Sequence, residues 1–175
     1  MEHFSTLTLN LKTYTVLQLL GHGKGGYSYL VEGDGQQFVL KQIHHEPCDY
    51  YTFGDKLAAE RGDYEKLLAA GIPIPRLLEV DVAQERILKE YICGPTVMEL
   101  TQKGLLQEEH FRQGQQMAQL AKAAGLNIDY YPTNFVLQEG KLFYIDYECN
   151  PYMEEWSFET WGSGYWKNQT TEEKK

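Results

Sequence analysis

The sequence contains little cysteine and little positive charge, and it has no long apolar run. Its 175 residues include only three cysteines, Cys48, Cys93 and Cys149, at wide spacing. An odd, widely spaced set does not predict a disulfide framework, so we expect reduced thiols in a cytoplasmic protein. No apolar run reaches the roughly 18 residues that a transmembrane helix needs. The first eleven residues lack a basic start followed by an apolar core, so no signal peptide is expected.

The charge balance is acidic. Lys and Arg number 16 against 25 Asp and Glu, which gives a formal net charge of −9. This balance argues against nucleic acid and against an anionic membrane as the main partner. Hydrophobic residues make up 42% and charged residues 23%, the composition of a folded globular chain. We therefore expect one domain, or one domain of two small lobes.

The first forty residues predict an antiparallel meander of three strands. Residues 13–20, 27–32 and 37–43 are rich in β-branched, aromatic and apolar side chains. A glycine cluster at 21–26 separates the first two strands. Gly33-Asp34-Gly35 separates the second and third, and it predicts a hairpin turn because Gly and Asp accept positive φ.

One helix and two further strands are expected next. Residues 55–70 have apolar side chains at three- and four-residue spacing, and Gly71 is a plausible end for that helix. Residues 76–82 and 86–92 then resemble strands joined by a short turn. The first half of the chain therefore predicts five strands and one helix.

The second half is expected to be mainly helical, with one hairpin. Thr96 and Glu99 are spaced as a capping box at the start of a short helix. Residues 108–124 carry the clearest amphipathic helix pattern in the chain. Two apolar runs, 134–137 and 142–145, predict a β-hairpin. A last helix is expected near 153–161.

The glycine segment is the first group with chemical meaning. Gly21, Gly23, Gly25, Gly26 and then Ser28 lie between two predicted strands. Backbone N–H groups without an obstructing Cβ can approach a phosphate closely. A dinucleotide-binding unit or a Walker loop would need a helix after the glycines, so both are disfavoured. The alternative is a flexible hairpin turn without a ligand.

Lys41 is the second such group. It follows the apolar residues of the third predicted strand, where a charge is costly to bury unless it is paired. Just after a glycine-rich hairpin, a phosphate-binding lysine is a reasonable interpretation. It would need an acidic partner, and Glu60 is the first candidate with Glu65 as the alternative. A lysine that extends to solvent at a strand edge is the competing interpretation.

Asp129, Asn134 and Asp146 form the third group. Asp129 and Asn134 flank an irregular turn before the predicted hairpin, and Asp146 follows its second strand. A carboxylate can accept a hydroxyl proton, and an amide and a second carboxylate can coordinate Mg²⁺. The competing interpretation is a turn held by side-chain hydrogen bonds and an Asp that only ends a strand.

Taken in order, these groups resemble the protein-kinase-like fold from about Leu19 to Glu148. Residues 71–75 (GIPIP) and 145–148 (IDYE) are similar to segments of the RIO, aminoglycoside and choline kinase groups. The resemblance implies an α+β fold of two lobes. Residues 1–92 would form a five-stranded antiparallel N-lobe with one helix, and 93–167 a reduced helical C-lobe. Residues 168–175 would form a disordered tail.

The resemblance also implies ligands and roles. ATP and Mg²⁺ would be bound, with the glycine loop over the phosphates and Lys41, held by Glu60, on the α and β phosphates. Glu90 and Ile92 would contact adenine through their backbone. Asn134 and Asp146 would hold Mg²⁺, and Asp129 would deprotonate a hydroxyl acceptor, either a small molecule or a protein Ser/Thr.

Two local departures from the family pattern affect these roles. The residues before Asp129 lack the usual His-Arg, and Lys89 occupies the position where an apolar gatekeeper is common. The glycine register is ambiguous as well. Aligning on Gly21, Gly23 and Gly26 places Ser28 over adenine. Aligning on Gly23, Gly25 and Ser28 places apolar Leu30 there instead, and this register is preferred.

The largest departure is length, because only 29 residues follow Asp146. We therefore expect a strongly truncated C-lobe without the platform that usually binds peptide substrates. A nucleotide-binding pseudokinase, or a regulatory interaction module without turnover, is the alternative function. Trp156, Trp161 and Trp166 would either close the core of the shortened lobe or form a self-association surface, which would make the protein a homodimer.

Overall fold

The computed structural model describes residues 5–23, 25–45 and 55–169, which have mixed α+β structure as expected. The chain divides into two compact units. The first holds Met1–Arg61 and Pro75–Tyr91, and the second holds Gly62–Ile74 and Ile92–Lys175. The lobe boundaries expected from the sequence stay predictions, and most of the expected tail at 168–175 lies outside the described residues.

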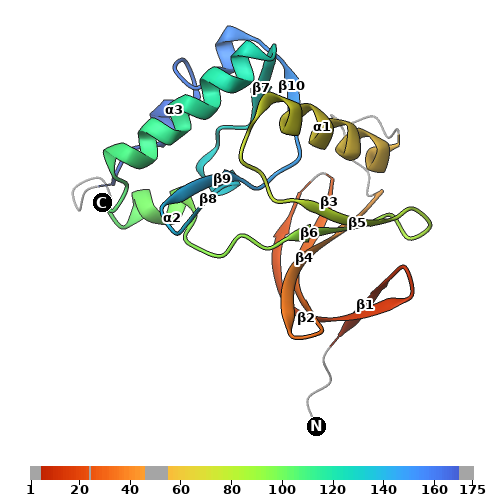
Figure 1. Ribbon diagram of the computed structural model, residues 1–175. Coiled ribbons are helices and arrows are strands. Elements are labelled where there is room, and N and C mark those ends of the chain that lie inside the picture. The colour runs from red at the N-terminus through yellow and green to blue at the C-terminus, as the bar shows by residue number, and fades with distance from the viewer. Residues whose placement is uncertain (1–4, 24, 46–54, 170–175) are drawn as a thin grey trace. The chain divides into compact units, whose positions relative to one another are not determined.

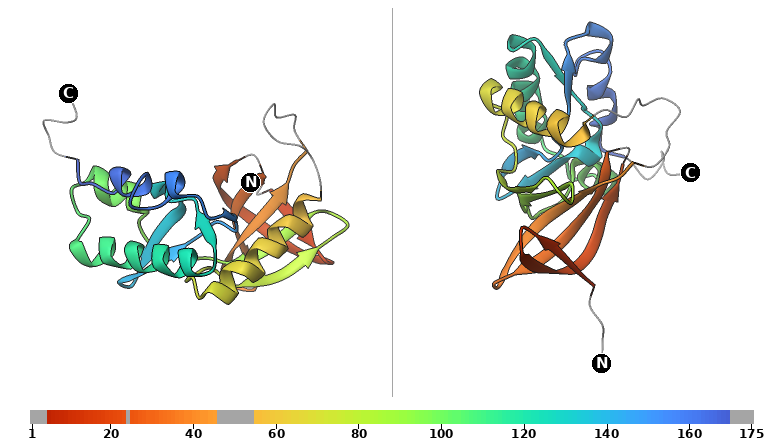
Figure 2. Two further views of the ribbon diagram at one scale, coloured as in Figure 1. Left: turned by 90° about the horizontal axis from the view of Figure 1, so that it is seen from above. Right: turned by 90° about the vertical axis from the view of Figure 1, so that its right-hand side faces the viewer.

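The first unit contains a six-stranded antiparallel sheet that is strongly curled (Figures 1 and 2). Its strands, in spatial order, are β1 (Thr6–Leu9), β2 (Lys12–His22), β3 (Gly26–Gly33), β4 (Gln36–Ile43), β6 (Arg86–Glu90) and β5 (Leu77–Asp81). The β3–β4 hairpin turns at Asp34 and Gly35, which have φ of 53° and 78°. The hairpin predicted from Gly33-Asp34-Gly35 is confirmed.

The expected count of five strands is wrong, because β1 adds a sixth. It pairs with β2 through a two-residue turn at Asn10 and Leu11, whose φ values are 46° and 73°. Both central residues of such a turn need positive φ, and glycine usually supplies one of them. A leucine in that conformation is uncommon, so this turn has no recognisable sequence pattern.

The β1–β2 turn also explains the curl of the sheet, because it bonds to the opposite edge. The Asn10 N–H donates to Asp81 Oδ2 at 2.9 Å, and Asn10 Nδ2 donates to the Val80 carbonyl at 2.9 Å. The Asp81 carboxylate accepts hydrogen bonds from the backbone N–H groups of Asn10 and Gln84. These two bonds, that from Asn10 first, hold the pKa of Asp81 below its usual value. Inside the curl lies a core of Leu9, Tyr14, Val31, Leu40 and Leu88.

Helix α1 (Lys56–Ala70) begins after Asp55, whose Oδ1 accepts a hydrogen bond from the Ala58 N–H at 2.9 Å. It ends before Gly71, which has φ of 83°, a conformation that favours glycine. Near its start, Leu57 packs with Ile43 and Ile87 of the sheet.

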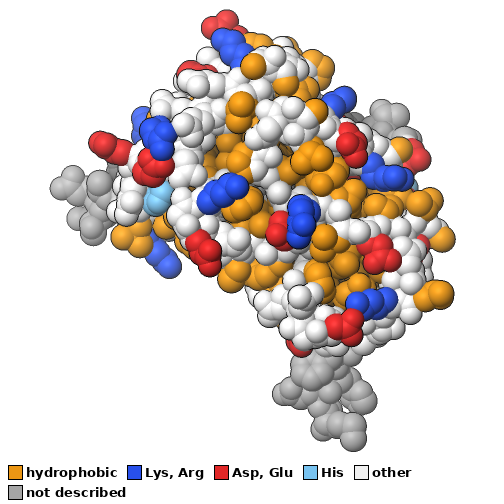
Figure 3. Space-filling model, viewed as in Figure 1, with side chains coloured by type: hydrophobic (Ala, Val, Ile, Leu, Met, Phe, Trp, Pro, Cys, Tyr) orange, Lys and Arg blue, Asp and Glu red, His pale blue; other side chains and the backbone are white. Residues whose placement is uncertain are grey.

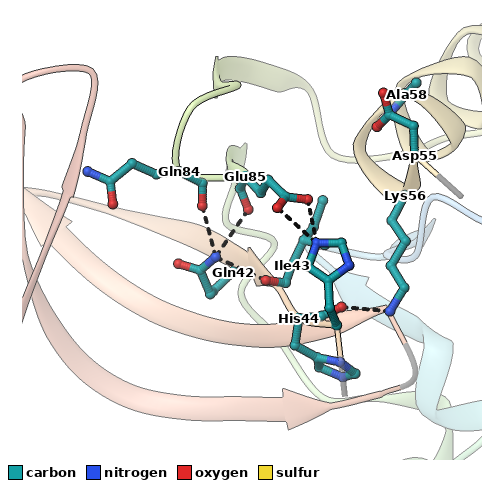
Figure 4. A network of polar contacts seen from close by, with 9 residues as sticks. Gln42, Ile43, His44, Asp55, Lys56, Ala58, Gln84 and Glu85 are labelled. Carbon is teal, nitrogen blue, oxygen red and sulfur yellow. Dashed lines mark hydrogen bonds and ion pairs between the residues drawn. The ribbon is translucent and has the colours of Figure 1, made fainter. Parts of the chain in front are cut away.

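A polar network fixes the end of β4 to the start of α1 (Figure 4). Lys56, which is 4% exposed, donates from Nζ to the His44 carbonyl at 2.6 Å. Gln42 Nε2 donates to the carbonyls of Gln84 and Glu85, at 3.0 and 3.3 Å, in the turn between β5 and β6. The Lys56 bond therefore joins α1, which carries Glu60, to the chain just after β4, which carries Lys41.

Besides the second half of α1, the described part of the second unit contains two helices, two strand pairs and three short 3₁₀ turns. They are α2 (Val97–Gln102), α3 (Glu108–Ala123), β7 (Leu126–Ile128), η1 (Pro132–Asn134), β8 (Phe135–Gln138), β9 (Lys141–Tyr144), β10 (Cys149–Pro151), η2 (Glu154–Trp156) and η3 (Gly162–Tyr165). β8 and β9 form the expected hairpin, and β7 pairs with β10. The Thr96 Oγ1 accepts a hydrogen bond from the Glu99 N–H at 3.1 Å, so the Thr96 half of the predicted capping box is confirmed.

The helix expected near 153–161 is wrong. Only η2 is helical in that range, and it lasts three residues. The carbonyl of Ser157 accepts hydrogen bonds from the N–H groups of both Trp161 and Gly162, and its Oγ accepts one from Thr160. These bonds close a single turn after Ser157 that is not continued as a regular helix.

Trp166 lies at the centre of the aromatic core of this unit and is 2% exposed. Its indole N–H donates to the Tyr130 carbonyl at 2.8 Å, and its ring lies 4.9 Å from Phe135 and 5.1 Å from Phe158 between centroids. Of the two roles considered for the tryptophans, Trp166 therefore has the core role. Trp156, in contrast, is 50% exposed.

The outer surface carries charged side chains of both signs, scattered among apolar ones on the face shown in Figure 3.

None of the helices in the described part of the chain combines the length and the apolar character that crossing a bilayer requires.

Two glycines in helices give a paired test of the packing. A Cβ added at Gly114 would lie 2.7 Å from the Trp166 ring, whereas one at Gly62 would meet nothing within 4 Å. We expect Gly114→Ala to lower the free energy of unfolding by about 1–3 kcal/mol through overpacking. Gly62→Ala should raise it by up to about 1 kcal/mol, because alanine is the better helix former. Urea denaturation measures both, and a Gly114→Ala variant as stable as the parent would contradict the packing described.

Candidate functional site

The predicted glycine segment lies at the turn between β2 and β3. The Gly23 N–H donates to the Gly26 carbonyl at 3.0 Å, and His44 Nε2 lies 2.6 Å from the Gly23 carbonyl oxygen. A Cβ on Gly26 would lie 2.3 Å from the Gln42 carbonyl oxygen, so strand packing alone requires glycine there. A Cβ on Gly21 or Gly23 would meet nothing within 4 Å, so packing does not explain those two glycines.

Beside this turn lies an ion pair that is largely buried. Lys41 Nζ is 2.8 Å from Glu60 Oε1, and the two side chains are 14% and 8% exposed. Of the two acidic partners that the sequence left open, the structure places Glu60 against Lys41, while Glu65 is exposed. A Cβ on Gly25 would lie only 3.4 Å from Lys41 Nζ, so the ammonium group is next to the glycine turn.

Ser28 and Leu30 share a face of the sheet with Lys41. Ser28 is the register partner of Lys41 across β3 and β4, and Leu30 is the partner of Val39 two residues away. Side chains alternate along a strand and pair across strands, so these side chains line the same face. Both glycine registers considered from the sequence stay predictions.

The two residues expected to contact adenine lie close together in the chain, Glu90 at the end of β6 and Ile92 just after it. The Glu90 N–H donates to the Arg76 carbonyl at 2.9 Å, and Glu90 Oε1 accepts from the Arg76 N–H at 3.3 Å. Ile92 is buried, and it begins the last segment of the second unit, Ile92–Lys175. Lys89 is also buried, at 5% exposure, and is the register partner of Val39. The adenine-binding role of Glu90 and Ile92 stays a prediction.

In the second unit, one side-chain and one backbone hydrogen bond bring Asp129, Asn134 and Asp146 into one neighbourhood. Asn134 Nδ2 donates to the Asp129 carbonyl at 3.3 Å. The Ile145 N–H donates to the Asn134 carbonyl at 2.9 Å, which places Asp146 one residue from that contact. Asp129 Oδ1 accepts from the Tyr131 N–H at 3.1 Å, so the turn expected as a competing interpretation is also present. All three residues are partly exposed.

Tyr144 links Asp129 to the segment that follows Asp146. This residue was not identified from the sequence. Its fully buried hydroxyl accepts from the Asp129 N–H at 3.1 Å and donates to the Glu148 carbonyl at 2.8 Å. Burial, followed by the negative charge of Asp146, raises the pKa of Tyr144 well above its usual value. The hydroxyl therefore stays protonated as a donor. A tyrosine in a buried strand needs such a partner, and that requirement is the clue the sequence offered.

The donor set at this position is suitable for Mg²⁺. The ion takes oxygen ligands in octahedral geometry and is commonly held by one or two protein groups, with phosphates and water completing the shell. Asn134 and Asp146 provide an amide and a carboxylate oxygen. Among the described residues no group of three or more His, Cys, Asp or Glu side chains is placed to hold a metal by itself. Residues 46–54, which include Glu46, Cys48 and Asp49, lie outside the described residues.

The candidate site residues form two groups. The first unit has a glycine turn beside a buried lysine–glutamate pair, and the second unit has carboxylate and amide side chains at a hairpin. No protein-family model matches the chain. The chain is 35% identical over 81 residues to the KEOPS complex subunit Bud32 of Pyrococcus abyssi. The match covers 44% of this chain and 36% of that protein, so the chain matches little more than a third of its relative. This distant and partial similarity supports a relation at the level of the kinase-like superfamily.

Proposed function

We propose that the protein is an ATP- and Mg²⁺-dependent phosphotransferase with a protein-kinase-like fold, acting on a hydroxyl of a protein Ser/Thr or of a small molecule. The observation that carries the proposal is the buried Lys41–Glu60 ion pair beside the glycine turn. A buried charge pair adds little net stability compared with apolar packing. Its place next to exposed, unhindered glycine backbone is better explained by a polyanionic ligand. The partial similarity to Bud32 supports the same class.

In this proposal the first unit binds the nucleotide phosphates. The ammonium group of Lys41 neutralises the α and β phosphates, and Glu60 keeps it oriented when no nucleotide is bound. The glycine turn at Gly21–Gly26 supplies backbone N–H donors. Such interactions contribute positioning and charge neutralisation, which are most of what phosphoryl transfer requires.

The second unit would supply the metal site and the base. Asn134 and Asp146 would hold Mg²⁺, which neutralises charge on the transferred phosphate. The Asp129 carboxylate would accept the proton of the acceptor hydroxyl as the hydroxyl oxygen attacks the γ-phosphorus and the bond from that phosphorus to the departing ADP breaks. Tyr144 acts as a positioning residue, because its hydroxyl holds the Asp129 backbone against the segment that follows Asp146.

Thermal stabilisation by ATP, with and without Mg²⁺, tests the proposed function directly. A ligand at 100 times its Kd adds about 2.7 kcal/mol to the free energy of unfolding, which raises the melting temperature measurably. We expect a rise with Mg-ATP that inorganic phosphate does not reproduce. No shift with any nucleotide would remove both the enzyme and the pseudokinase alternative. A shift without turnover would leave the pseudokinase.

Asp146→Asn should abolish the Mg²⁺ increment of ATP binding. A neutral amide is a poorer ligand for a hard cation than a carboxylate, so the affinity for ATP alone should change little. Calorimetric titration of ATP with and without Mg²⁺ measures the increment. Glu108→Gln removes the same charge at an exposed position on α3 and serves as the control. An unchanged Mg²⁺ increment in Asp146→Asn would contradict the metal assignment.

A further inference from the structure

Four aromatic side chains of the second unit form a continuous row. Tyr131 and Tyr165 have ring centroids 5.5 Å apart, Tyr165 and Trp161 5.2 Å, and Trp161 and Trp156 5.8 Å. Among the described residues the two ends of this aromatic row share no ring contact, so the rings follow one another and do not enclose a single point. The row begins at Tyr131, whose N–H donates to the Asp129 carboxylate.

Three of the four rings are exposed and Trp161 is half-buried, although other rings of the same segment are buried. Trp156 is 50%, Tyr165 46% and Tyr131 38% exposed, whereas Phe158 and Trp166 in the same segment are 1% and 2% exposed. The segment therefore separates core rings from surface rings. Several large rings left in water on one surface indicate a binding surface more than a part of the core.

The backbone beneath the row is held in place. Asn127, buried next to Asp129, accepts a hydrogen bond from the Met153 N–H with Oδ1 and donates to the Trp156 carbonyl with Nδ2 at 3.4 Å. The Trp161 N–H donates to the Ser157 carbonyl at 2.9 Å. A surface ordered before binding loses less conformational entropy when a ligand arrives.

The charge of this segment selects the ligand. Residues 142–166 contain no Lys or Arg, and they contain five acidic residues, Asp146, Glu148, Glu154, Glu155 and Glu159. Glu154, Glu155 and Glu159 lie exposed among the tryptophans. Aromatic faces attract Lys and Arg side chains, and neighbouring carboxylates complement the same cations.

We propose that the aromatic row is the docking surface for the acceptor, and that the acceptor is a basic polypeptide segment that presents a Ser or Thr hydroxyl to Asp129. This inference rests on the proposed function. A row of rings suits an extended chain with several side chains, whereas a single small cation would need rings around one point. The acidic flanks exclude nucleic acid as the occupant.

Binding of defined synthetic peptides tests the proposal without any need for turnover. The probe is a short peptide with one Ser between Arg and Leu residues, and its partners carry Gln or Glu in place of every Arg. Affinities are measured by calorimetry at about 150 mM salt, where long-range charge attraction is screened. We expect the Arg peptide to bind and the other two to bind at least about tenfold more weakly.

Two variants of the protein separate ring contacts from charge. Trp156→Ala should weaken binding of the Arg peptide by about tenfold or more, the loss expected for a half-exposed aromatic anchor. Glu155→Gln/Glu159→Gln, which leaves every ring in place, should weaken it as well. The matched control is Glu32→Gln/Glu65→Gln, which removes the same charge from exposed positions elsewhere. That control should bind like the parent, and melting temperatures confirm that each variant is folded.

Four results would overturn the proposal. The first three are a Gln peptide that binds as tightly as the Arg peptide, a control variant that binds the Arg peptide as weakly as Glu155→Gln/Glu159→Gln, and an Arg peptide that does not bind at all. The fourth is a concentration-dependent dimer of the parent that Trp156→Ala dissociates, which would mean that a second copy covers the row. ATP stabilisation is measured separately. If it persists while the peptide fails to bind, only this inference fails. If the peptide binds but no nucleotide stabilises the protein, the acceptor role and the proposed function fail together.

Discussion

Asp129→Asn is expected to lower turnover by roughly 10²–10⁴-fold while it leaves ATP affinity nearly unchanged. That range is the usual contribution of a positioned general base. The carboxylate would act on the acceptor hydroxyl and not on ATP, so its loss affects the transition state more than nucleotide binding. The asparagine Oδ1 can still accept the hydrogen bond from the Tyr131 N–H, so the turn should survive. ATP hydrolysis, ATP affinity and melting temperature are measured on this variant and on the parent.

The three measurements distinguish three roles for Asp129. In an enzyme, turnover falls alone. In a nucleotide sensor, parent turnover is already negligible and the substitution changes little. If the residue is only structural, binding, turnover and melting temperature fall together. Parent turnover no higher than that of the variant, with an acceptor peptide present, would contradict the enzyme assignment.

Removal of the Lys41 ammonium group is the second large effect. Lys41→Ala should weaken Mg-ATP binding or turnover strongly, because the lysine neutralises the triphosphate. It also leaves Glu60 as a buried charge without its ion-pair partner, and breaking such a pair costs about 3–5 kcal/mol. The free energy of unfolding should therefore fall at the same time. Calorimetry with Mg-ATP and urea denaturation measure the two effects.

Two further variants separate nucleotide binding from stability. Lys41→Met/Glu60→Gln removes both charges of the pair, so stability should recover in part while ATP binding stays weak. Lys24→Ala removes a positive charge from the glycine segment itself, and we expect the smaller loss of affinity there. Mg-ATP binding by Lys41→Ala that equals the parent's would refute the phosphate-binding role.

Local patterns predicted those parts of the fold whose turns carry recognisable residues. The β3–β4 hairpin turns at Asp34-Gly35 and the β8–β9 hairpin at Glu139-Gly140, and each pair has positive φ with glycine second. The β1 strand was missed because its turn places leucine where glycine is usual. Closure of the curled sheet by Asn10 on Asp81 joins residues 71 positions apart, and no local pattern can reveal such a contact.

The candidate site was predictable by residue type but not by geometry. Charge in an apolar strand identified Lys41, but Glu60 and Glu65 lie on the same predicted helix and were left open. Which helix position faces Lys41 depends on how α1 packs against the sheet, through contacts such as Leu57 with Ile43 and Ile87. Asn127 and Tyr144 were missed for a related reason. Asn127 bonds to the Trp156 carbonyl, which is remote in the sequence, and Tyr144 bonds to the Glu148 carbonyl in the turn that follows its strand. Only the folded chain brings these groups together.

The buried hydroxyl of Tyr144 also couples the fold to alkaline pH. Its pKa in the folded protein is raised above the ordinary value of 10.0, mainly by burial. Below about pH 10, both the folded and the unfolded chain keep this proton, and the stabilising contribution is complete. As pH rises from there toward the raised pKa, the unfolded chain gives up the proton and the folded protein retains it. The free energy of unfolding then falls by about 1.4 kcal/mol per pH unit for this one group. Tyr144, on the strand that positions Asp129 and Asp146, thus makes the fold less stable at high pH. Through the neutral range its hydroxyl stays protonated, and its hydrogen bonds to Asp129 and Glu148 are unaffected by pH.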